Sequence, residues 1–402
     1  MALMPVADAL AAVLSGAEAL PEEMTALDLA FKRILARDLA ALRTQPPQAM
    51  SAMDGYAVRT TDAQAGARLK VIGEIAAGRP FDRVVRPGEA VRIFTGGVVP
   101  EGADAVIIQE DTVVEAGGIK ITEAAIAGRH IRRAGVDFHE GDVLLRAGRE
   151  LSDRDLSLTA SMNYPLLPVH RRPKVALLAT GDELVMPGET PGPGQIVYSN
   201  GYALRALARA EGADVVDLGI AADTLEATRS GIRRARNSGA DILITTGGAS
   251  VGDHDLVKQS LDAENVAMAF WRIAMRPGKP LMYGRLGDMR VIGLPGNPVS
   301  SYVCAFLFLV PLIRKLCGRR ATYHTTESAL LGHGLSANDQ REDYLRARLT
   351  TREDGALIAT PVNQQDSSLL GNLAAAQALL IRPPFAPAAD AGTVCKILRL
   401  PA

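Results

Sequence analysis

The sequence has little cysteine, few aromatic residues and almost no net charge. Its 402 residues include three cysteines, none in a C-x-x-C pair, so we expect buried free thiols and a reducing, cytoplasmic location. Aromatic residues make up 4% and the formal net charge is -1. These values argue against a base-stacking platform or a basic surface, and therefore against nucleic acid as a partner.

Long hydrophobic runs are also missing. The longest, Val303 to Ile313, contains Pro311 and is too short to span a bilayer, so we expect a buried helix and no membrane partner. The alanine-rich N-terminal segment lacks a basic region and contains Asp8. This pattern favours a surface helix over a signal peptide.

Several catalytic motifs are absent from the sequence. There is no G-x-x-x-x-G-K-[ST] loop, and no G-x-G-x-x-G follows a strand-like segment, which argues against a Walker nucleotide site and a nicotinamide-dependent oxidoreductase. The six histidines show no zinc-ligand spacing, and there is no G-x-S-x-G nucleophile elbow.

The chain length predicts two to four domains, and one of them has a clear pattern. Within residues 173–320, a strand at Lys174–Thr180 is followed by a helix at Ser199–Ala213 and another strand. Asp223 can then cap a second helix, and Ala240–Thr246 reads as a third strand. Alternating strands and helices predict a doubly wound α/β domain with a parallel sheet.

The rest of the chain predicts three further regions. Short strands separated by Gly, Pro and Asp make residues 46–136 a β-rich inserted domain. The flanking residues, 1–45 and 137–172, are expected to form a helical or linker domain. Alternating residues predict a small β domain over 321–402, including a hairpin and a terminal strand.

Three polar loops follow strands of the doubly wound domain: "ATGDEL", "ITTGGASVGDHD" and "GLPGNPVS". Ligands of such sheets bind at the carboxyl ends of the strands, so we expect the loops to share one site. The glycines of the second loop would cradle an anion, but its aspartates would repel one unless a divalent cation lay between them. Asp253 or Asp255 would then be a ligand; alternatively, Asp255 only caps the next helix.

Basic residues gather in "WRIAMRPGKP", where Arg272, Arg276 and Lys279 would suit a polyanionic ligand if the segment is a strand. The alternative is a solvated strand edge. In the inserted region, "SAMDGYAVR" contains Asp54 and "IFTGGVVPEGADAVI" contains Thr95; from the residues alone, each is only a plausible loop.

Taken together, these strings resemble one family. "SAMDGYAVR", "IFTGGVVPEGADAVI", "RRPKVALLATGDEL", "SNGYAL", "ILITTGGASVGDHD", "RPGKP" and "GLPGNPVSS" are similar, in order, to motifs of the MoeA-type molybdopterin molybdenumtransferases and the E-domain of gephyrin. The resemblance implies an α/β multidomain fold: an elongated helical domain with a β-rich insert, a doubly wound MogA/MoaB-like domain and a small C-terminal β-barrel-like domain.

The resemblance also implies a reaction and partners. Molybdenum from molybdate would enter adenylylated molybdopterin, with release of AMP and with Mg²⁺ as the divalent cation. The protein would be a homodimer whose active site is shared between chains. A molybdopterin adenylyltransferase would supply the substrate, and molybdoenzyme apoproteins or chaperones would receive the product.

The resemblance assigns roles to particular residues. The catalytic set would be Asp54, Thr95, Glu183, Asp223 and Asp255. Metal ligands would come from Asp182, Glu183, Asp223 and Asp255. Substrate would be bound by Gly247, Gly248, Ser250, Arg272, Arg276, Lys279, Asn297, Arg341 and Ser367. Arg272 and Arg276 stand where the family commonly has lysines. The positive charge is kept, but a planar guanidinium group replaces a compact ammonium group.

Three other functions remain as alternatives. A molybdopterin adenylyltransferase or nucleotide pyrophosphatase would share the doubly wound domain but not the whole chain. A non-enzymatic scaffold is allowed by the likeness to gephyrin. A nicotinamide-dependent oxidoreductase would rest on the sheet alone, without its glycine fingerprint.

Overall fold

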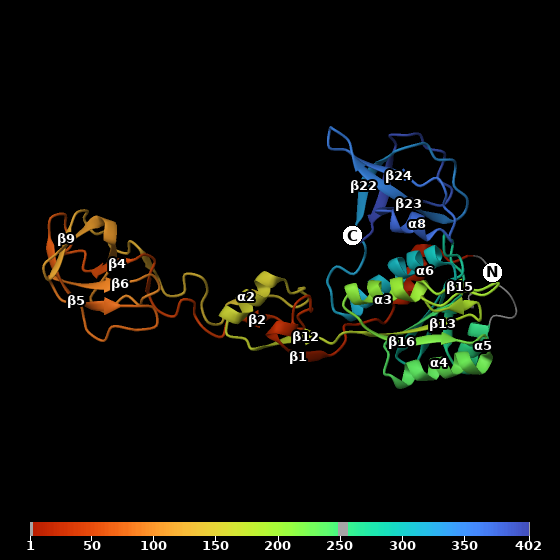
Figure 1. The fold of residues 1–402 in the computed structure, drawn as a ribbon, viewed down its shortest axis with the longest axis horizontal. Helices are drawn as coiled ribbons and strands as arrows, with labels where there is room; N and C mark the ends of the chain where they lie inside the picture. Colours follow the sequence, from red (N-terminus) through yellow and green to blue (C-terminus); the bar gives the residue numbers. More distant parts are fainter. Residues whose placement is uncertain (1–2, 248–255, 402) are drawn as a thin grey trace.

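The computed structural model describes residues 3–247 and 256–401. The molecule is elongated (Figure 1). A β-rich inserted domain lies at one end and a small connecting region in the middle. The doubly wound domain and a C-terminal β domain lie together at the other end, so the inserted domain is far from the doubly wound sheet of its own chain.

The doubly wound domain contains the predicted parallel sheet. Its strand order is β16-β13-β17-β21-β20-β18; the first four strands are parallel, and β20 pairs antiparallel with both β21 and β18. Alternate residues of β13 enter two different cores, with Val175 and Leu177 on one face and Ala176 and Leu178 on the other. The strands are β13 (Lys174–Thr180), β16 (Asp214–Ala221), β17 (Ile242–Thr246), β18 (Ala267–Phe270), β20 (Met282–Leu286) and β21 (Met289–Leu294).

Helices cover both faces of this sheet: α3 (Asn200–Ala210), α4 (Leu225–Asn237) and α5 (Leu256–Ala263). The predicted cap of α4 was wrong by one residue. Thr224 is the N-cap, and its hydroxyl accepts a hydrogen bond from the Ala227 N–H at 3.2 Å, while Asp223 bonds elsewhere.

The apolar run near residue 300 is a buried helix, as predicted. It comprises α6 (Pro298–Cys304), a π-helical turn (Ala305–Leu309) and α7 (Val310–Leu316). Pro311 has no N–H to donate to the preceding turn, which accounts for the change in helical pitch at that place. By length and composition Pro298–Leu316 could cross a membrane, but 83% of its most apolar window is buried inside the protein.

Residues 1–45 and 137–172, for which a helical or linker domain was expected, contain little helix. The first helix, α1 (Val6–Leu14), packs on α7 in the core of the doubly wound domain. The connecting region contains one helix, α2 (Asp153–Ser161), which Ser152 caps. Its other elements are short: β1 (Glu22–Ala26) pairs with β12 (Leu166–His170), and β2 (Leu39–Ala40) with β11 (Val143–Leu145), with a 3-10 turn at Leu27–Leu29. These pairs join residues more than a hundred positions apart, a relation that local sequence patterns do not encode.

The inserted domain is a six-stranded sheet of order β7-β4-β6-β5-β9-β8. It joins the connecting region through a second, two-stranded pairing of β3 with β10. Its elements are β3 (Met50–Ser51), β4 (Gly55–Val58), β5 (Arg68–Ile75), β6 (Glu89–Ile93), β7 (Ala105–Ile108), a 3-10 turn (Gln109–Asp111), β8 (Thr112–Glu115), β9 (Gly118–Ile121) and β10 (Ile131–Arg132).

The C-terminal domain is a closed five-stranded barrel, because β23 pairs with both β24 and β25. The predicted hairpin and terminal strand are confirmed as β23–β24 and β26. The short β19 (Met275–Arg276) of the doubly wound domain adds to the outside of β23. The elements are β22 (Thr326–Leu331), β23 (Glu342–Thr351), β24 (Leu357–Pro361), α8 (Leu370–Ala374), β25 (Ala378–Arg382) and β26 (Val394–Arg399).

Candidate active site

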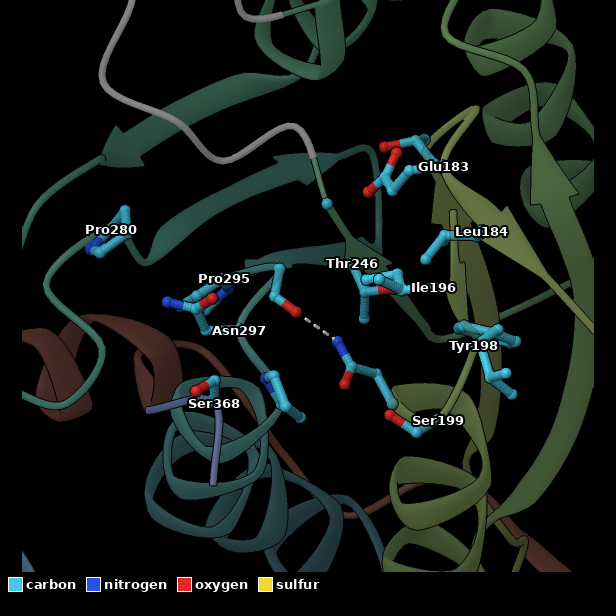
Figure 2. Close-up of a pocket in the computed structure, with 16 residues that line it drawn as sticks. Glu183, Leu184, Ile196, Tyr198, Ser199, Thr246, Pro280, Pro295, Asn297 and Ser368 are labelled. Atoms are coloured by element: carbon cyan, nitrogen blue, oxygen red, sulfur yellow. Dashed lines mark hydrogen bonds between the residues drawn. The ribbon is translucent and has the colours of Figure 1, made fainter. Parts of the chain in front are cut away.

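A cavity of about 660 Å³ lies at the carboxyl ends of β13, β17 and β21 (Figure 2). Each of the three predicted loops contributes to its wall, through Glu183, Gly247 and Asn297. An apolar side is formed by the paired segments β14 (Leu184–Val185) and β15 (Ile196–Val197). The parallel sheet thus brings together three loops, of which the first and the last are more than a hundred residues apart in sequence.

The floor of this cavity carries hydroxyl groups. Thr180 ends β13 and Thr246 ends β17, and both are almost fully buried. The Thr180 hydroxyl has no hydrogen-bond partner among the described residues. Both threonines line the cavity, and the Thr180 hydroxyl is covered by the backbone of Gly247.

Gly247 allows the end of β17 to pack closely against the end of β13. Its φ is 91°, in the left-handed region, and an added Cβ would overlap the backbone oxygen of Thr180. The next predicted residues, Gly248, Ser250, Asp253 and Asp255, lie outside the described part of the chain.

The predicted acidic residues lie at the ends of β13 and β16. Glu183 is in the cavity wall. Asp182 and Asp223 hold each other's loops: the Asp223 N–H donates to Asp182 at 3.0 Å, and the Asp182 N–H donates to Asp223 at 3.3 Å. Within residues 3–247 and 256–401, no three His, Cys, Asp or Glu side chains gather in a ready-made metal site. Mg²⁺ commonly uses one or two carboxylates together with substrate phosphates and waters, and these acids fit such a site.

The C-terminal domain reaches the cavity through one loop. Asn297, at the start of α6, donates from its side chain to the Ser367 hydroxyl at 2.9 Å, and the Ser367 carbonyl accepts from Val299 N–H at 3.1 Å. Ser368 lines the cavity itself. The structure thus brings the predicted Asn297 and Ser367 together. Sequence reasoning missed Ser368, although its neighbour Ser367 marked the loop.

The predicted basic residues do not form one cluster at the cavity. Arg276 forms an ion pair with Asp343 of the barrel, and its Nε donates to that carboxylate at 2.9 Å. Arg341 binds Asp339 at 2.7 Å. The expected continuous strand is interrupted, because β18 ends at Phe270 and β19 contains only Met275 and Arg276. Lys279 is exposed and directly precedes Pro280 in the cavity wall, and Arg272 is also exposed.

Asp54 and Thr95 lie together in the inserted domain. The Asp54 carboxylate accepts hydrogen bonds from the Thr95 N–H at 2.7 Å and from its hydroxyl at 2.8 Å. These bonds, with a smaller contribution from Arg92, hold the pKa of Asp54 below its usual value, so the exposed carboxylate stays ionised. Both residues lie next to strands β4 and β6 of the inserted domain, which is at the opposite end of the molecule from the doubly wound domain (Figure 1).

Fold and cavity together define a multidomain α/β protein with a ligand site at the carboxyl edge of a doubly wound sheet. Three family models match consecutive parts of the chain. They are the MoeA N-terminal region (domains I and II) over residues 4–163, a probable molybdopterin binding domain over 176–315, and the MoeA C-terminal region (domain IV) over 328–400. The chain belongs to the MoeA family.

Similar proteins cover nearly the whole chain. A molybdopterin molybdenumtransferase from Haemophilus influenzae is 39% identical over 85% of each chain, and one from Nostoc is 35% identical over 94% of this chain and 89% of its own. Among solved structures, the molybdopterin biosynthesis MoeA protein from Pyrococcus horikoshii aligns over the full length of both chains, with a TM-score of 0.87 at 30% identity.

Proposed function

We propose that this chain, a molybdopterin molybdenumtransferase of molybdenum cofactor biosynthesis, inserts molybdenum from molybdate into adenylylated molybdopterin and releases AMP. The observation that carries the proposal is the cavity, which lies within the part of the chain similar to a molybdopterin binding domain. The relatives named for this activity extend over nearly the whole chain.

The cavity wall supports the binding of such a substrate. Leu184, Ile196 and Val197 offer an apolar surface to a flat ring system, and the polar residues Ser199, Asn200 and Asn297 of the same wall would hydrogen-bond its negatively charged oxygens. Because Gly247 lacks a side chain, the end of β17 packs closely on Thr180 at the end of β13, and both residues line the cavity. In this proposal the chain's own residues bind and orient the reactants, which is the main requirement of a phosphoanhydride reaction.

Mg²⁺ belongs to the proposal as the divalent cation. Glu183, with Asp182 or Asp223, would hold it, and when bound it would neutralise negative charge on the phosphoanhydride. Glu183→Gln is expected to weaken cation binding roughly tenfold, as for a lost ligating carboxylate. Calorimetric titration of Mg²⁺ in the presence of AMP measures this without turnover; unchanged affinity would contradict the assignment.

We also propose a homodimer in which Asp54 and Thr95 of one chain complete the cavity of the other. The distance of the inserted domain from the cavity of its own chain supports this arrangement. The connecting region also exposes apolar side chains that a second copy would cover. These are Met24, Leu29, Phe31, Leu42 and Leu166.

We also propose a location and two reaction partners for the protein. A cytoplasmic location is supported by three cysteines, all free and buried. The adenylylated substrate would come from a molybdopterin adenylyltransferase, and molybdoenzyme apoproteins or their chaperones would accept the product.

The direct test is AMP release from adenylylated molybdopterin with Mg²⁺, with and without molybdate at low micromolar concentration. We expect release that depends on molybdate, together with active cofactor in a reporter apo-enzyme. Folded protein that binds the pterin but releases no AMP would contradict the proposal and favour a scaffold. Consumption of ATP would favour an adenylyltransferase.

A further inference from the structure

Arg92 lies beside the Asp54–Thr95 pair of the inserted domain. It belongs to β6, and its register partner on the antiparallel strand β4 is Tyr56. Asp54 directly precedes β4, and Thr95 follows the end of β6. The pair therefore comes from the ends of the two strands that Arg92 and Tyr56 join. The motif that marked Thr95 begins one residue after Arg92, so sequence reasoning missed this arginine.

Two aromatic rings hold the guanidinium group of Arg92. Its Cζ atom lies 5.0 Å from the ring centroid of Tyr56 and 5.0 Å from that of Phe94. Tyr56 is buried, and Arg92 and Phe94 are half-buried. A guanidinium group is attracted to the negative face of an aromatic ring, and contact with two rings limits its orientation. Phe94 directly precedes Thr95, so one of these contacts lies next to the pair in sequence.

Hydrogen bonds connect the same guanidinium group to the segment that carries Asp54. Nη2 of Arg92 donates to the side-chain oxygen of Gln109 at 2.8 Å, and the Gln109 N–H donates to the Asp54 carbonyl at 3.3 Å. Nη1 of Arg92 approaches the carbonyl oxygen of Gly55 at 3.5 Å. Arg92 thus contacts both segments of the pair, the one at the start of β4 and the one at the end of β6.

The charge of Arg92 also acts on the Asp54 carboxylate. The hydrogen bonds from Thr95 have the largest effect on this group, and Arg92 adds a smaller one; both hold the pKa of Asp54 below its usual value. Attraction between charges at the surface is weak, because water screens it. The contacts of Arg92 with the two rings and with the Gly55 and Gln109 segments are therefore the main evidence for its role.

We propose that Arg92 is a positioning residue that fixes the Asp54 carboxylate and the Thr95 hydroxyl in the arrangement that the reaction requires. The inference rests on the proposed function, in which Asp54 and Thr95 complete the cavity of a second chain, and it adds the residue that holds them. Such a role needs no contact with substrate, because a displacement of about 1 Å at a catalytic group can lower a rate by about a hundredfold.

The first test compares Arg92→Met with wild type. Methionine is unbranched and can keep the packing between the two rings, but it loses the charge and the hydrogen bonds. We expect kcat to fall about tenfold while the KM for adenylylated molybdopterin changes less than about threefold, because the displaced groups act in the reaction step. Melting temperatures of both proteins show how much of each sample is folded.

The matched control is Arg83→Met in the same domain. Arg83 is exposed, its Cζ lies 5.9 Å from the ring centroid of Phe81, and its Nη1 donates to the Ile72 carbonyl at 3.4 Å. It therefore resembles Arg92 in stacking on a ring, but its hydrogen bond goes to a different strand, β5. We expect wild-type kcat for this variant.

A second test combines Arg92→Met with Asp54→Asn. If Arg92 acts through Asp54, the double variant should have the kcat of Asp54→Asn to within about threefold, because the group that Arg92 positions is already lost. A role of Arg92 in folding alone, or in binding substrate directly, would lower kcat by the same factor in both backgrounds. A further tenfold fall in the double variant would therefore overturn the inference.

The remaining outcomes separate this inference from the proposed function. Active wild type with normal kcat in Arg92→Met would overturn the inference alone. An inactive wild-type protein would contradict the proposed function and this inference with it. If Arg92→Met does not fold, Arg92→Lys takes its place, since lysine keeps the charge but not the planar group. The same loss of kcat, absent when Asp54→Asn is already present, is expected for that variant, and normal kcat would overturn the inference.

Discussion

At the scale of single residues, Arg276 joins two domains. It pairs with Asp343, whose side chain is 5% exposed, while half of the arginine side chain is exposed. Arg276→Ala would leave a buried carboxylate without its partner, so we expect a loss of roughly 2–3 kcal/mol in the free energy of unfolding. Chemical denaturation measures the loss. The control is Arg272→Ala, because Arg272 makes no ion pair with the described residues.

The comparison separates two roles for Arg276. If it mainly binds substrate, as the sequence indicated, Arg276→Ala would raise KM and leave stability close to that of Arg272→Ala. If the ion pair with Asp343 is its main role, Arg276→Ala would be less stable than Arg272→Ala, and the activity of the protein that remains folded would change little.

Asp54 offers a second residue-level prediction. Asp54→Asn removes an exposed negative charge, so we expect little change in stability but a fall in kcat of about a hundredfold, the size usual for a lost acid–base or charge-stabilising group. Asp104→Asn is the matched control, since Asp104 binds the N–H and hydroxyl of Thr60 in the same way, each at 2.7 Å. Equal activity of the two variants would rule out a special role for Asp54.

The contribution of the Asp54 carboxylate to stability depends on pH in a definite direction. Because the folded pKa of Asp54 is below its usual value, its contribution to stability is present above the unfolded pKa. That contribution disappears as the pH falls through the lowered folded pKa. Because the carboxylate is exposed, the contribution is small, and the slight difference in stability between wild type and Asp54→Asn should vanish in strongly acidic solution.

Single residues were predictable where a motif marked them. Glu183, Gly247 and Asn297 were found because each sits in a polar loop directly after a strand. Tyr198 and Ser368 carry no such mark; their position in the wall depends on how the flanking segments pack. The pairing of Arg276 with Asp343 was equally hidden, because it joins two domains across 67 residues.

At the scale of elements, the start of α3 depends on Gly201. Alanine normally stabilises a helix relative to glycine by up to about 1 kcal/mol. At Gly201 we expect the opposite, a loss of roughly 1–3 kcal/mol, because the new methyl group would overlap Tyr198. Thermal and chemical denaturation of Gly201→Ala test this.

The matched control for that prediction is Gly371→Ala in α8. Nothing lies within 4 Å of an added Cβ there, so this variant should be neutral or slightly more stable. If both variants gained stability, the close packing of Tyr198 against α3 would be wrong.

Sequence patterns predicted the elements whose formation depends on residues close together in the sequence. β13 is a continuous apolar run, and a short polar turn separates the two strands of the β23–β24 hairpin. The strands of the connecting region could not be predicted, because β1 is stabilised by pairing with β12, which follows the inserted domain in the sequence. No helical or strand periodicity in residues 22–26 contains that information.

At the scale of the whole molecule, the proposed sharing of sites between chains predicts complementation. At Mg²⁺ concentrations well below the dissociation constant of the Glu183→Gln protein, chains carrying Asp54→Asn and chains carrying Glu183→Gln should each have little activity. Unfolding and refolding them as a mixture should restore about a quarter of wild-type activity, because half of the dimers would be mixed and each would contain one intact site. No recovery, despite mixed dimers detected by mass spectrometry, would mean that each site belongs to one chain.

The central claim of this account is molybdenum transfer coupled to AMP release at the cavity of the doubly wound domain. The most direct measurement counts both products in one reaction: AMP by chromatography, and pterin-bound molybdenum by elemental analysis after removal of free molybdate. The account predicts that the two appear in equal amounts and that both require adenylylated substrate. AMP formed without bound molybdenum, at saturating molybdate, would contradict it.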